Sequence, residues 1–249
     1  MLTRKEFKEN AKKQLRGKRT TGVIITLVMI ALIWCVELIM MGCWGIGNAF
    51  SKTAGVTAMA IICILWVILA FVLSTGYCWA FLKIRRGEQT GIGELFHPFR
   101  RFGKVIGVNV LIFVVLLVIY LIGAAIAAVL AIFVHPVLAV IVGIAAVLLL
   151  YRISLGFAMV PYLLFDRSEL GVRACINYSV ALMRGHKWEF FVLCLSFIWW
   201  YLLTAITCGI LSLWIGPYVS ATIANYYDEL VRLNSGEGNG QTIAEESEE

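Results

Sequence analysis

The stretch that decides the fold is residues 105–150, VIGVNVLIFVVLLVIYLIGAAIAAVLAIFVHPVLAVIVGIAAVLLL, which contains no Asp, Glu, Lys or Arg. A transmembrane helix needs about 20 consecutive, mostly apolar residues, so this stretch is long enough for two helices. His135-Pro136 interrupts it, and proline ends one helix and is favoured in the first turn of the next. The sequence therefore predicts a membrane hairpin with spans over about 105–134 and 137–165.

The rest of the chain has a similar composition. Hydrophobic residues make up 61% of the chain and charged residues 14%, whereas a soluble domain has about 25% charged residues. This composition excludes an ordinary soluble enzyme, a disordered chain and a secreted disulfide scaffold. Further apolar runs cover 22–45, 56–81 and 189–228. As one helix the last run would measure about 60 Å, twice the hydrocarbon thickness, so it is predicted to form two spans that turn near Gly209.

The predicted fold class is all-α: an integral membrane bundle of six transmembrane helices in three hairpins, with amphipathic cytoplasmic helices. Residues 1–20 are expected to form a basic amphipathic helix, because Phe7, Ala11 and Leu15 recur at every fourth position among lysines. The six-helix membrane domain would cover residues 21–230. Residues 231–249 lack the apolar side chains that a packed fold needs, which predicts a disordered acidic tail.

Two further segments between the apolar runs have apolar residues at helical spacing. They are Ile92, Leu95, Phe96, Phe99 and Phe102, and Val172, Ile176, Val180 and Met183. Like the N-terminal helix, each is expected either to lie on the membrane surface or to pack on the inner mouth of the bundle. The sequence leaves both arrangements open.

Basic residues are concentrated on one side of the predicted topology. They are Arg4, Lys5, Lys8, Lys12, Lys13, Arg16, Lys18 and Arg19, then Lys83, Arg85, Arg86, Arg100, Arg101 and Lys104, and finally Arg167, Arg173, Arg184 and Lys187. Cytoplasmic loops carry an excess of Lys and Arg, so both termini and the two long loops are predicted to be cytoplasmic. The expected location is the cytoplasmic (plasma) membrane, with anionic lipid at its inner face as partner. Because no recognition module follows the basic start, nucleic acid is not an expected partner.

Two charged residues lie inside predicted spans. Glu37 belongs to the first span and Arg152 to the fourth, and counting from the inner ends places them at similar depths. An unpaired charge at a helix centre costs roughly 2.5–3.5 kcal/mol on the insertion scale. The two residues are therefore a candidate intramembrane ion pair. The alternatives are a proton- or anion-handling site, and snorkelling of each side chain to its nearer surface.

The last hairpin is unusually aromatic. Its candidate lining for a lipid or amphiphile groove consists of Trp199, Trp200, Tyr201, Trp214, Pro217 and Tyr218. Trp199 and Trp200 fall near mid-span rather than in an interfacial belt. The alternative interpretation is aromatic packing between helices.

Small residues at four-residue spacing mark the hairpin of the third and fourth spans. They are Gly123, Ala127 and Ala131 in one span and Ala139, Gly143 and Ala146 in the other. Such seams let helix backbones approach closely. We expect the two spans to pack on each other through them, with dimerisation as the alternative.

The sequence offers no constellation for catalysis or metal binding. The chain has 3 histidines, His97, His135 and His186, in separate loops, and no HExxH, Walker or GxGxxG motif. Its 7 cysteines show no metal-ligand spacing, and only Cys43 and Cys208 fall near the outer surface, where they could pair. We therefore expect no catalytic residue, no cofactor and no metal.

The second half of the chain carries a recognisable pattern. It runs from Arg152-Ile-Ser154 through Pro161 and Asp166 to Ser179 and Gly185-His-Lys-Trp188, then Trp199-Trp200 and Trp214-Ile-Gly-Pro217-Tyr218. This pattern resembles an uncharacterised family of bacterial six-span membrane proteins, the domain-of-unknown-function family nine-seven-five. Part of it is also similar to the membrane domain of some glycerophosphodiester phosphodiesterases. The resemblance implies a multi-pass fold, a bend in the fourth span near Ser154–Pro161, and no established activity.

Three classes of function remain after these observations. The first is a non-enzymatic membrane scaffold or envelope-associated factor, which would use the charged cytoplasmic segments to bind a protein partner. The second is a lipid- or amphiphile-binding protein or transporter, with a site near Arg152 and the aromatic last hairpin. The third is an intramembrane enzyme, for which no catalytic group is evident.

Overall fold

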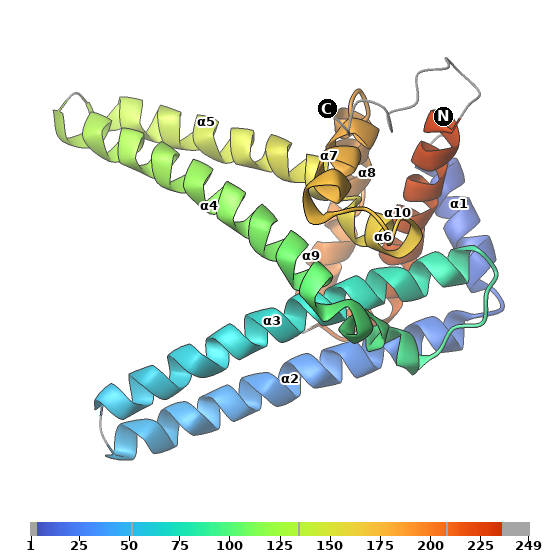
Figure 1. Ribbon diagram of the computed structural model, residues 1–249, viewed down its shortest axis with the longest axis horizontal. Helices are drawn as coiled ribbons and strands as arrows, with labels where there is room; N and C mark the ends of the chain where they lie inside the picture. The colour runs from blue at the N-terminus through green and yellow to red at the C-terminus, as the bar shows by residue number, and fades with distance from the viewer. Residues whose placement is uncertain (1–3, 51, 134, 208, 236–249) are drawn as a thin grey trace. The chain divides into compact units, whose positions relative to one another are not determined.

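The computed structural model describes residues 4–50, 52–133, 135–207 and 209–235, and within these ranges the chain is helical and contains no strand. Figure 1 shows the order of the elements. They are α1 (Arg4–Leu15), α2 (Arg19–Phe50), α3 (Lys52–Arg85), the short 3-10 helices η1 (Ile92–Leu95) and η2 (His97–Arg101), α4 (Phe102–Phe133), α5 (Pro136–Ser154), η3 (Leu155–Phe157), α6 (Val160–Asp166), α7 (Val172–Leu182), α8 (Lys187–Leu195), α9 (Ile198–Ile206) and α10 (Ser212–Asn234).

The helices confirm the predicted class of an all-α membrane protein. Among the described residues, 5 helical stretches are long and apolar enough to cross a membrane: Arg19–Trp44, Gly55–Arg85, Ile92–Ile132, Val137–Asp166 and Lys187–Ile206. The helix α10 is not among them, because its Gly, Pro, Tyr, Asn and charged residues together make it too polar. The predicted count of six spans is therefore not confirmed.

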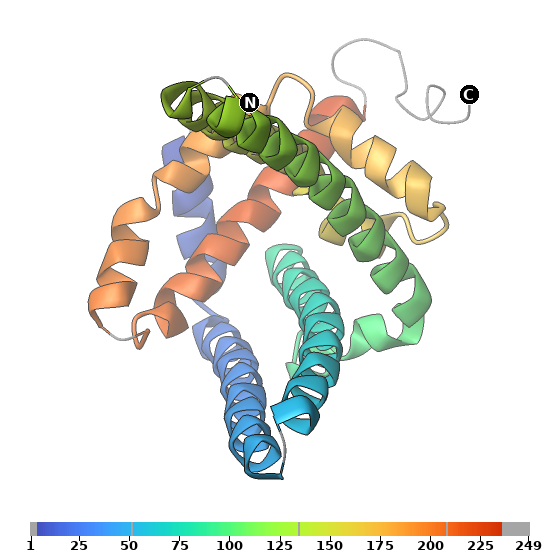
Figure 2. The same cartoon turned by 90° about the vertical axis from the view of Figure 1, so that its left-hand side faces the viewer.

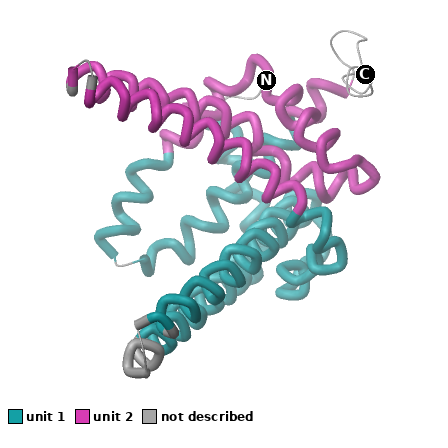
Figure 3. The backbone as a smooth tube through the Cα atoms, turned by 60° about the vertical axis from the view of Figure 1, so that its left-hand side comes forward, with its two compact units in different colours: residues 1–106, 197–229 teal, residues 107–196, 230–249 magenta. Residues whose placement is uncertain are grey.

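The chain divides into two compact units, coloured separately in Figure 3. Unit 1 contains residues 1–106 and 197–229, and unit 2 contains residues 107–196 and 230–249. The sequence predicts a disordered acidic tail over 231–249, but residues 231–234 continue α10, and residues 236–249 lie outside the described residues. Each unit is described below by itself.

Unit 1 is built on the long hairpin of α2 and α3, which lie side by side (Figure 2). The apolar face of α1 is buried in this unit: Phe7, Ala11 and Leu15 are inaccessible to solvent or nearly so. The Phe7 ring lies 5.4 Å from the ring of Tyr226 in α10. Of the two arrangements that the sequence left open for this helix, the structure shows the packed one.

A close approach of two backbones fixes the segment after α3. A Cβ added at Gly76 would lie only 2.8 Å from the carbonyl carbon of Leu95, which is fully buried in η1. Only glycine leaves room for that contact. The apolar periodicity of this segment predicted a regular helix. The structure instead has two 3-10 turns joined at Phe96, and Phe96, Phe99 and Phe102 stay exposed and stack on one another.

In unit 2, α4 and α5 approach each other through the predicted seam of small residues. A Cβ added at Gly123 would lie 2.9 Å from the Cβ of Ala146. The close packing expected from small-residue spacing is therefore present at this pair, whereas no atom lies within 4 Å of a Cβ added at Gly143.

The predicted fourth span, 137–165, is not one helix. The helix α5 ends at Ser154, the 3-10 turn η3 follows, and α6 begins at Val160 with Pro161 in its first turn. Proline is tolerated there because the first backbone N–H groups of a helix have no intrahelical partner. The bend expected near Ser154–Pro161 is therefore present, and it leaves Arg152 in the last turn of α5.

The predicted fifth span is also interrupted. The helix α8 ends at Leu195 and α9 begins at Ile198, with the backbone N–H of Ser196 donating to Val192 and its hydroxyl to Leu193. A serine hydroxyl bonded to a preceding carbonyl competes with the helical hydrogen bonds. This break coincides with the boundary between the two units.

Candidate functional site

A candidate site in unit 1 is a groove between the α1–α2 segment and the α9–α10 segment, called here the unit 1 groove. Its volume is about 580 Å³, which is within the range of about 300–1,000 Å³ for ligand pockets. It is lined by Lys12, Leu15, Arg19, Thr20, Val23, Ile24, Trp200, Leu211, Trp214, Ile215, Pro217 and Tyr218. The lining is mostly apolar and aromatic, with two cations.

Two glycines bring α2 and α10 together at the base of this groove. A Cβ added at Gly22 would lie 3.3 Å from the Cβ of Pro217, and one at Gly216 would lie 3.2 Å from the Cγ2 of Thr26. The hydroxyl of Thr26 donates to the Gly22 carbonyl at 2.9 Å and lies 2.9 Å from the Tyr77 hydroxyl. These contacts hold α2, α3 and α10 in one packed arrangement.

The basic face of α1 contacts aromatic rings of the last hairpin. The Lys12 Nζ lies 5.9 Å from the centroid of the Tyr218 ring, and the Lys8 Nζ lies 4.5 Å from that of Phe197. The Phe197 and Tyr218 rings meet edge to face at 5.6 Å. An ammonium group within about 6 Å of a ring centroid is attracted by the ring. The cations of α1 are thus positioned beside the groove.

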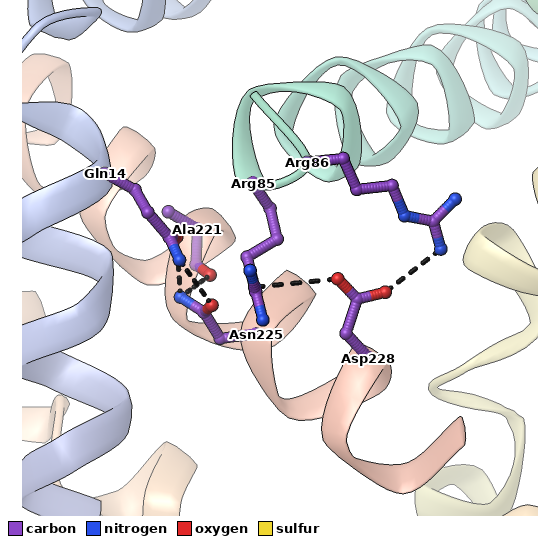
Figure 4. A network of polar contacts seen from close by, with 6 residues as sticks. All are labelled: Gln14, Arg85, Arg86, Ala221, Asn225 and Asp228. Carbon is purple, nitrogen blue, oxygen red and sulfur yellow. Dashed lines mark hydrogen bonds and ion pairs between the residues drawn. The ribbon is translucent and has the colours of Figure 1, made fainter. Parts of the chain in front are cut away.

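Polar side chains fix α1 and α3 onto α10 (Figure 4). Gln14 and Asn225 exchange two hydrogen bonds, each of 3.0 Å, across 211 residues of sequence. Asp228 accepts a hydrogen bond of 3.0 Å from Arg86 and lies 3.5 Å from the Nε of Arg85. These contacts hold the helix that carries Lys12 and Leu15 in position.

Few features of the sequence point to these anchoring residues. Asn225 lies on the buried face of α10, with only 3% of its surface exposed, and a buried amide needs hydrogen-bond partners. The need for hydrogen-bond partners predicts that a buried Asn225 is paired, but it does not identify Gln14 as the partner.

The predicted aromatic residues divide into two groups. Trp200, Trp214, Pro217 and Tyr218 line the unit 1 groove. Trp199 and Tyr201 do not, and both are exposed on α9. Neighbouring residues of a helix point about 100° apart, so Trp200 and its two neighbours cannot all face one groove.

The candidate ion pair falls in different units. Glu37 is exposed on α2 in unit 1, and Arg152 is exposed on α5 in unit 2. Their pairing stays a prediction. The candidate cysteine pair also stays untested, because Cys208 lies outside the described residues.

The five motif residues have local structural contacts. The hydroxyl of buried Ser179 donates to the Gly156 carbonyl at 2.8 Å, which ties α7 to η3. Ser154 donates to the Tyr151 carbonyl, Pro161 lies in the first turn of α6 and Asp166 ends that helix. Gly185 has a φ of 80°, a left-handed conformation that favours glycine, and it permits the turn between α7 and α8.

Comparisons with known proteins give one match. Residues 1–234 match the family described as "Protein of unknown function (DUF975)". No curated protein and no solved structure matches the chain, and the similarity to glycerophosphodiester phosphodiesterases is not shown. Within the described residues, no group of three or more His, Cys, Asp and Glu side chains is placed to hold a metal ion.

Proposed function

Starting from the premise that the chain belongs to the DUF975 family, whose description assigns no activity, we propose that this multi-pass membrane protein binds a lipid-like amphiphile in the unit 1 groove. The observation that carries the proposal is the lining of that groove. It combines a mostly apolar wall with Lys12 and Arg19, which matches a ligand that has an apolar chain and an anionic head.

The packing of the start of the chain against α10 distinguishes the two ends of the groove. The start of the chain runs antiparallel to α10, since Gln14 meets Asn225 and Gly22 meets Pro217. Lys12 and Arg19 therefore lie toward one end of the groove, and Ile24 and Leu211 toward the other. We infer that the head of the amphiphile contacts the cations and that its chain lies along the apolar end.

The distribution of basic residues supports a cytoplasmic position for the cationic end. We propose that both termini face the cytoplasm and that the groove opens to the inner leaflet of the plasma membrane, where anionic lipids are abundant.

In a cysteine-less background, a cysteine replacing Thr53 should react with a membrane-impermeant thiol reagent from outside. One replacing Gly91 should not. The reverse labelling would contradict this orientation.

We favour binding over catalysis because the groove lining contains no carboxylate, histidine or cysteine side chain among the described residues. Histidine and carboxylate side chains are the most frequent general bases. A scaffold role draws its support only from the charged cytoplasmic segments, and the groove favours the lipid-binding role over it.

The proposal is tested by titrating the full-length protein in micelles with phosphatidylglycerol and counting bound lipid by native mass spectrometry. Lys12→Gln should weaken binding about fivefold, since a basic residue near an anionic headgroup contributes about 1 kcal/mol. Lys13→Gln is the matched control, because Lys13 is exposed on the same helix and does not line the groove.

A second pair of variants tests the apolar end. Ile24→Trp should fill the groove and reduce bound lipid, whereas Leu27→Trp places the same side chain on an exposed position of α2 outside it. Equal lipid binding by both variants, together with equal binding by Lys12→Gln and Lys13→Gln, would refute the proposal.

A further inference from the structure

Unit 2 contains a second concave site, called here the unit 2 pocket. It has a volume of about 570 Å³ and lies between the end of α5 and the start of α8. It is lined by Leu148, Tyr151, Arg152, Leu155, Arg184, Gly185, Lys187, Trp188 and Phe191. The lining supplies three cations and no carboxylate.

The cations come from separate segments that the fold brings together. Arg152 lies in the last turn of α5, and Arg184 and Lys187 flank the left-handed Gly185. The Lys187 side chain passes over η3 at Gly156. Its Nζ would lie only 3.4 Å from a Cβ added at that glycine. The hydrogen bond from the Ser179 hydroxyl to the Gly156 carbonyl holds α7 against η3 at the same residue.

An aromatic cluster forms the apolar part of the pocket. The rings of Tyr151 and Phe191 meet edge to face at 5.6 Å, and those of Trp188 and Phe191 lie 5.2 Å apart. Trp188 has 71% of its surface exposed. A tryptophan at the end of an apolar helix is typical of the membrane–water interface.

Neighbouring acidic groups do not enter the pocket. Glu189 belongs to the first turn of α8, but its carboxylate lies 3.3 Å from the Nδ1 of His186, and neither residue lines the pocket. The net charge presented by the lining is therefore positive, and the complementary ligand is an anion.

We propose that the unit 2 pocket binds the phosphate-bearing headgroup of an anionic membrane phospholipid. Guanidinium groups match the geometry of phosphate oxygens and can bind them in pairs. Leu148, Leu155 and the aromatic cluster provide an apolar path for the start of an acyl chain. The unit 2 pocket shares no lining residue with the unit 1 groove, so it does not depend on the proposed function.

The test uses the full-length protein in micelles, titrated with phosphatidylglycerol and, in parallel, with phosphatidylcholine. The titrations are made in the Lys12→Gln, Arg19→Gln background, which weakens headgroup binding in the unit 1 groove. Arg152→Gln, Arg184→Gln and Lys187→Gln should each weaken phosphatidylglycerol binding about fivefold. The control is Arg173→Gln, because Arg173 is an exposed cation of α7 outside the pocket.

Two further measurements keep the proposal falsifiable if a glutamine variant fails to fold. Arg152→Lys preserves the charge and should retain more binding than Arg152→Gln. Binding to the unsubstituted pocket should weaken as salt rises toward 1 M, because ions screen the attraction. Equal binding of both lipids, or identical binding by all variants and the control, would overturn the proposal. Complete displacement of the lipid by soluble glycerol phosphate would also overturn it, since the site would then be one for a free anion.

Discussion

The paired amides of Gln14 and Asn225 offer a quantitative test of how α1 is held. Replacing Asn225 by leucine removes both reciprocal bonds and the bond from its amide to the Ala221 carbonyl. A neutral hydrogen bond contributes about 1 kcal/mol net, and a buried group left without a partner costs about 1–3 kcal/mol. We expect Asn225→Leu to lower the free energy of unfolding by about 2–3 kcal/mol.

A double-mutant cycle of Gln14→Leu and Asn225→Leu separates the energy of the amide pair from the energy of side-chain packing. Gln14→Leu leaves Asn225 buried with its oxygen unpaired, so it should cost about 1–2 kcal/mol by itself. In the double variant neither amide is stranded, and the loss should be smaller than the sum by about 1–2 kcal/mol. The assay is unfolding of the full-length protein in micelles, with each variant compared to the unsubstituted chain.

The cycle also has a functional consequence. Lys12 and Leu15 line the unit 1 groove from α1, so loosening α1 should reduce lipid binding in the same variants that lose stability. Strictly additive losses of stability would refute the reasoning, because they would mean that the two amides act independently. Lipid binding unchanged in a destabilised Asn225→Leu variant would show that α1 is not needed as a groove wall.

Three other perturbations follow from the packing. Ser179→Ala should cost about 1–3 kcal/mol by leaving a buried carbonyl of η3 unpaired, measured by thermal unfolding in micelles, and a neutral result would refute the tie between α7 and η3. Gly76→Ala should strongly destabilise the fold because its Cβ would overlap the backbone of η1, whereas Gly143→Ala, with no atom within 4 Å of the added Cβ, should be nearly neutral in the same assay. If Glu37 and Arg152 pair, Glu37→Gln and Arg152→Gln should each cost about 3–5 kcal/mol and the double variant less than their sum; additive losses would exclude the pair.

The long helices could be predicted from sequence because the length of each apolar run determines them. The apolar runs at 22–45, 56–81 and 105–134 correspond to α2, α3 and α4, each of which extends a few residues further. A bilayer requires a minimum apolar length and tolerates no exposed irregular backbone. Hydropathy alone therefore finds these helices, and it finds their ends less well because polar residues can continue a helix beyond the membrane.

The segments after Ser154 were predicted less well because hydropathy does not report helix breaks. The run 137–165 is apolar throughout most of its length, yet α5 ends at Ser154 and two short elements follow. The apolar run continues past the end of α5, so counting along the run does not give the depth of Arg152. Its place with Arg184, Gly185 and Lys187 in the lining of one pocket depends on tertiary folding, which no spacing in the sequence encodes.

The helices α1 and α10 show why a basic amphipathic pattern is ambiguous in a membrane protein. Such a pattern predicts a helix that binds anionic lipid through its own surface, but the apolar face of α1 is covered by α3 and α10. What remains available for lipid is its basic face, and that face lies beside the aromatic rings of the last hairpin. Under the proposed function, lipid contacts a groove made by several helices rather than the surface of one helix. Neutralising α1 should consequently affect lipid binding position by position, with Lys12 sensitive and Lys13 tolerant, rather than in proportion to the total charge removed.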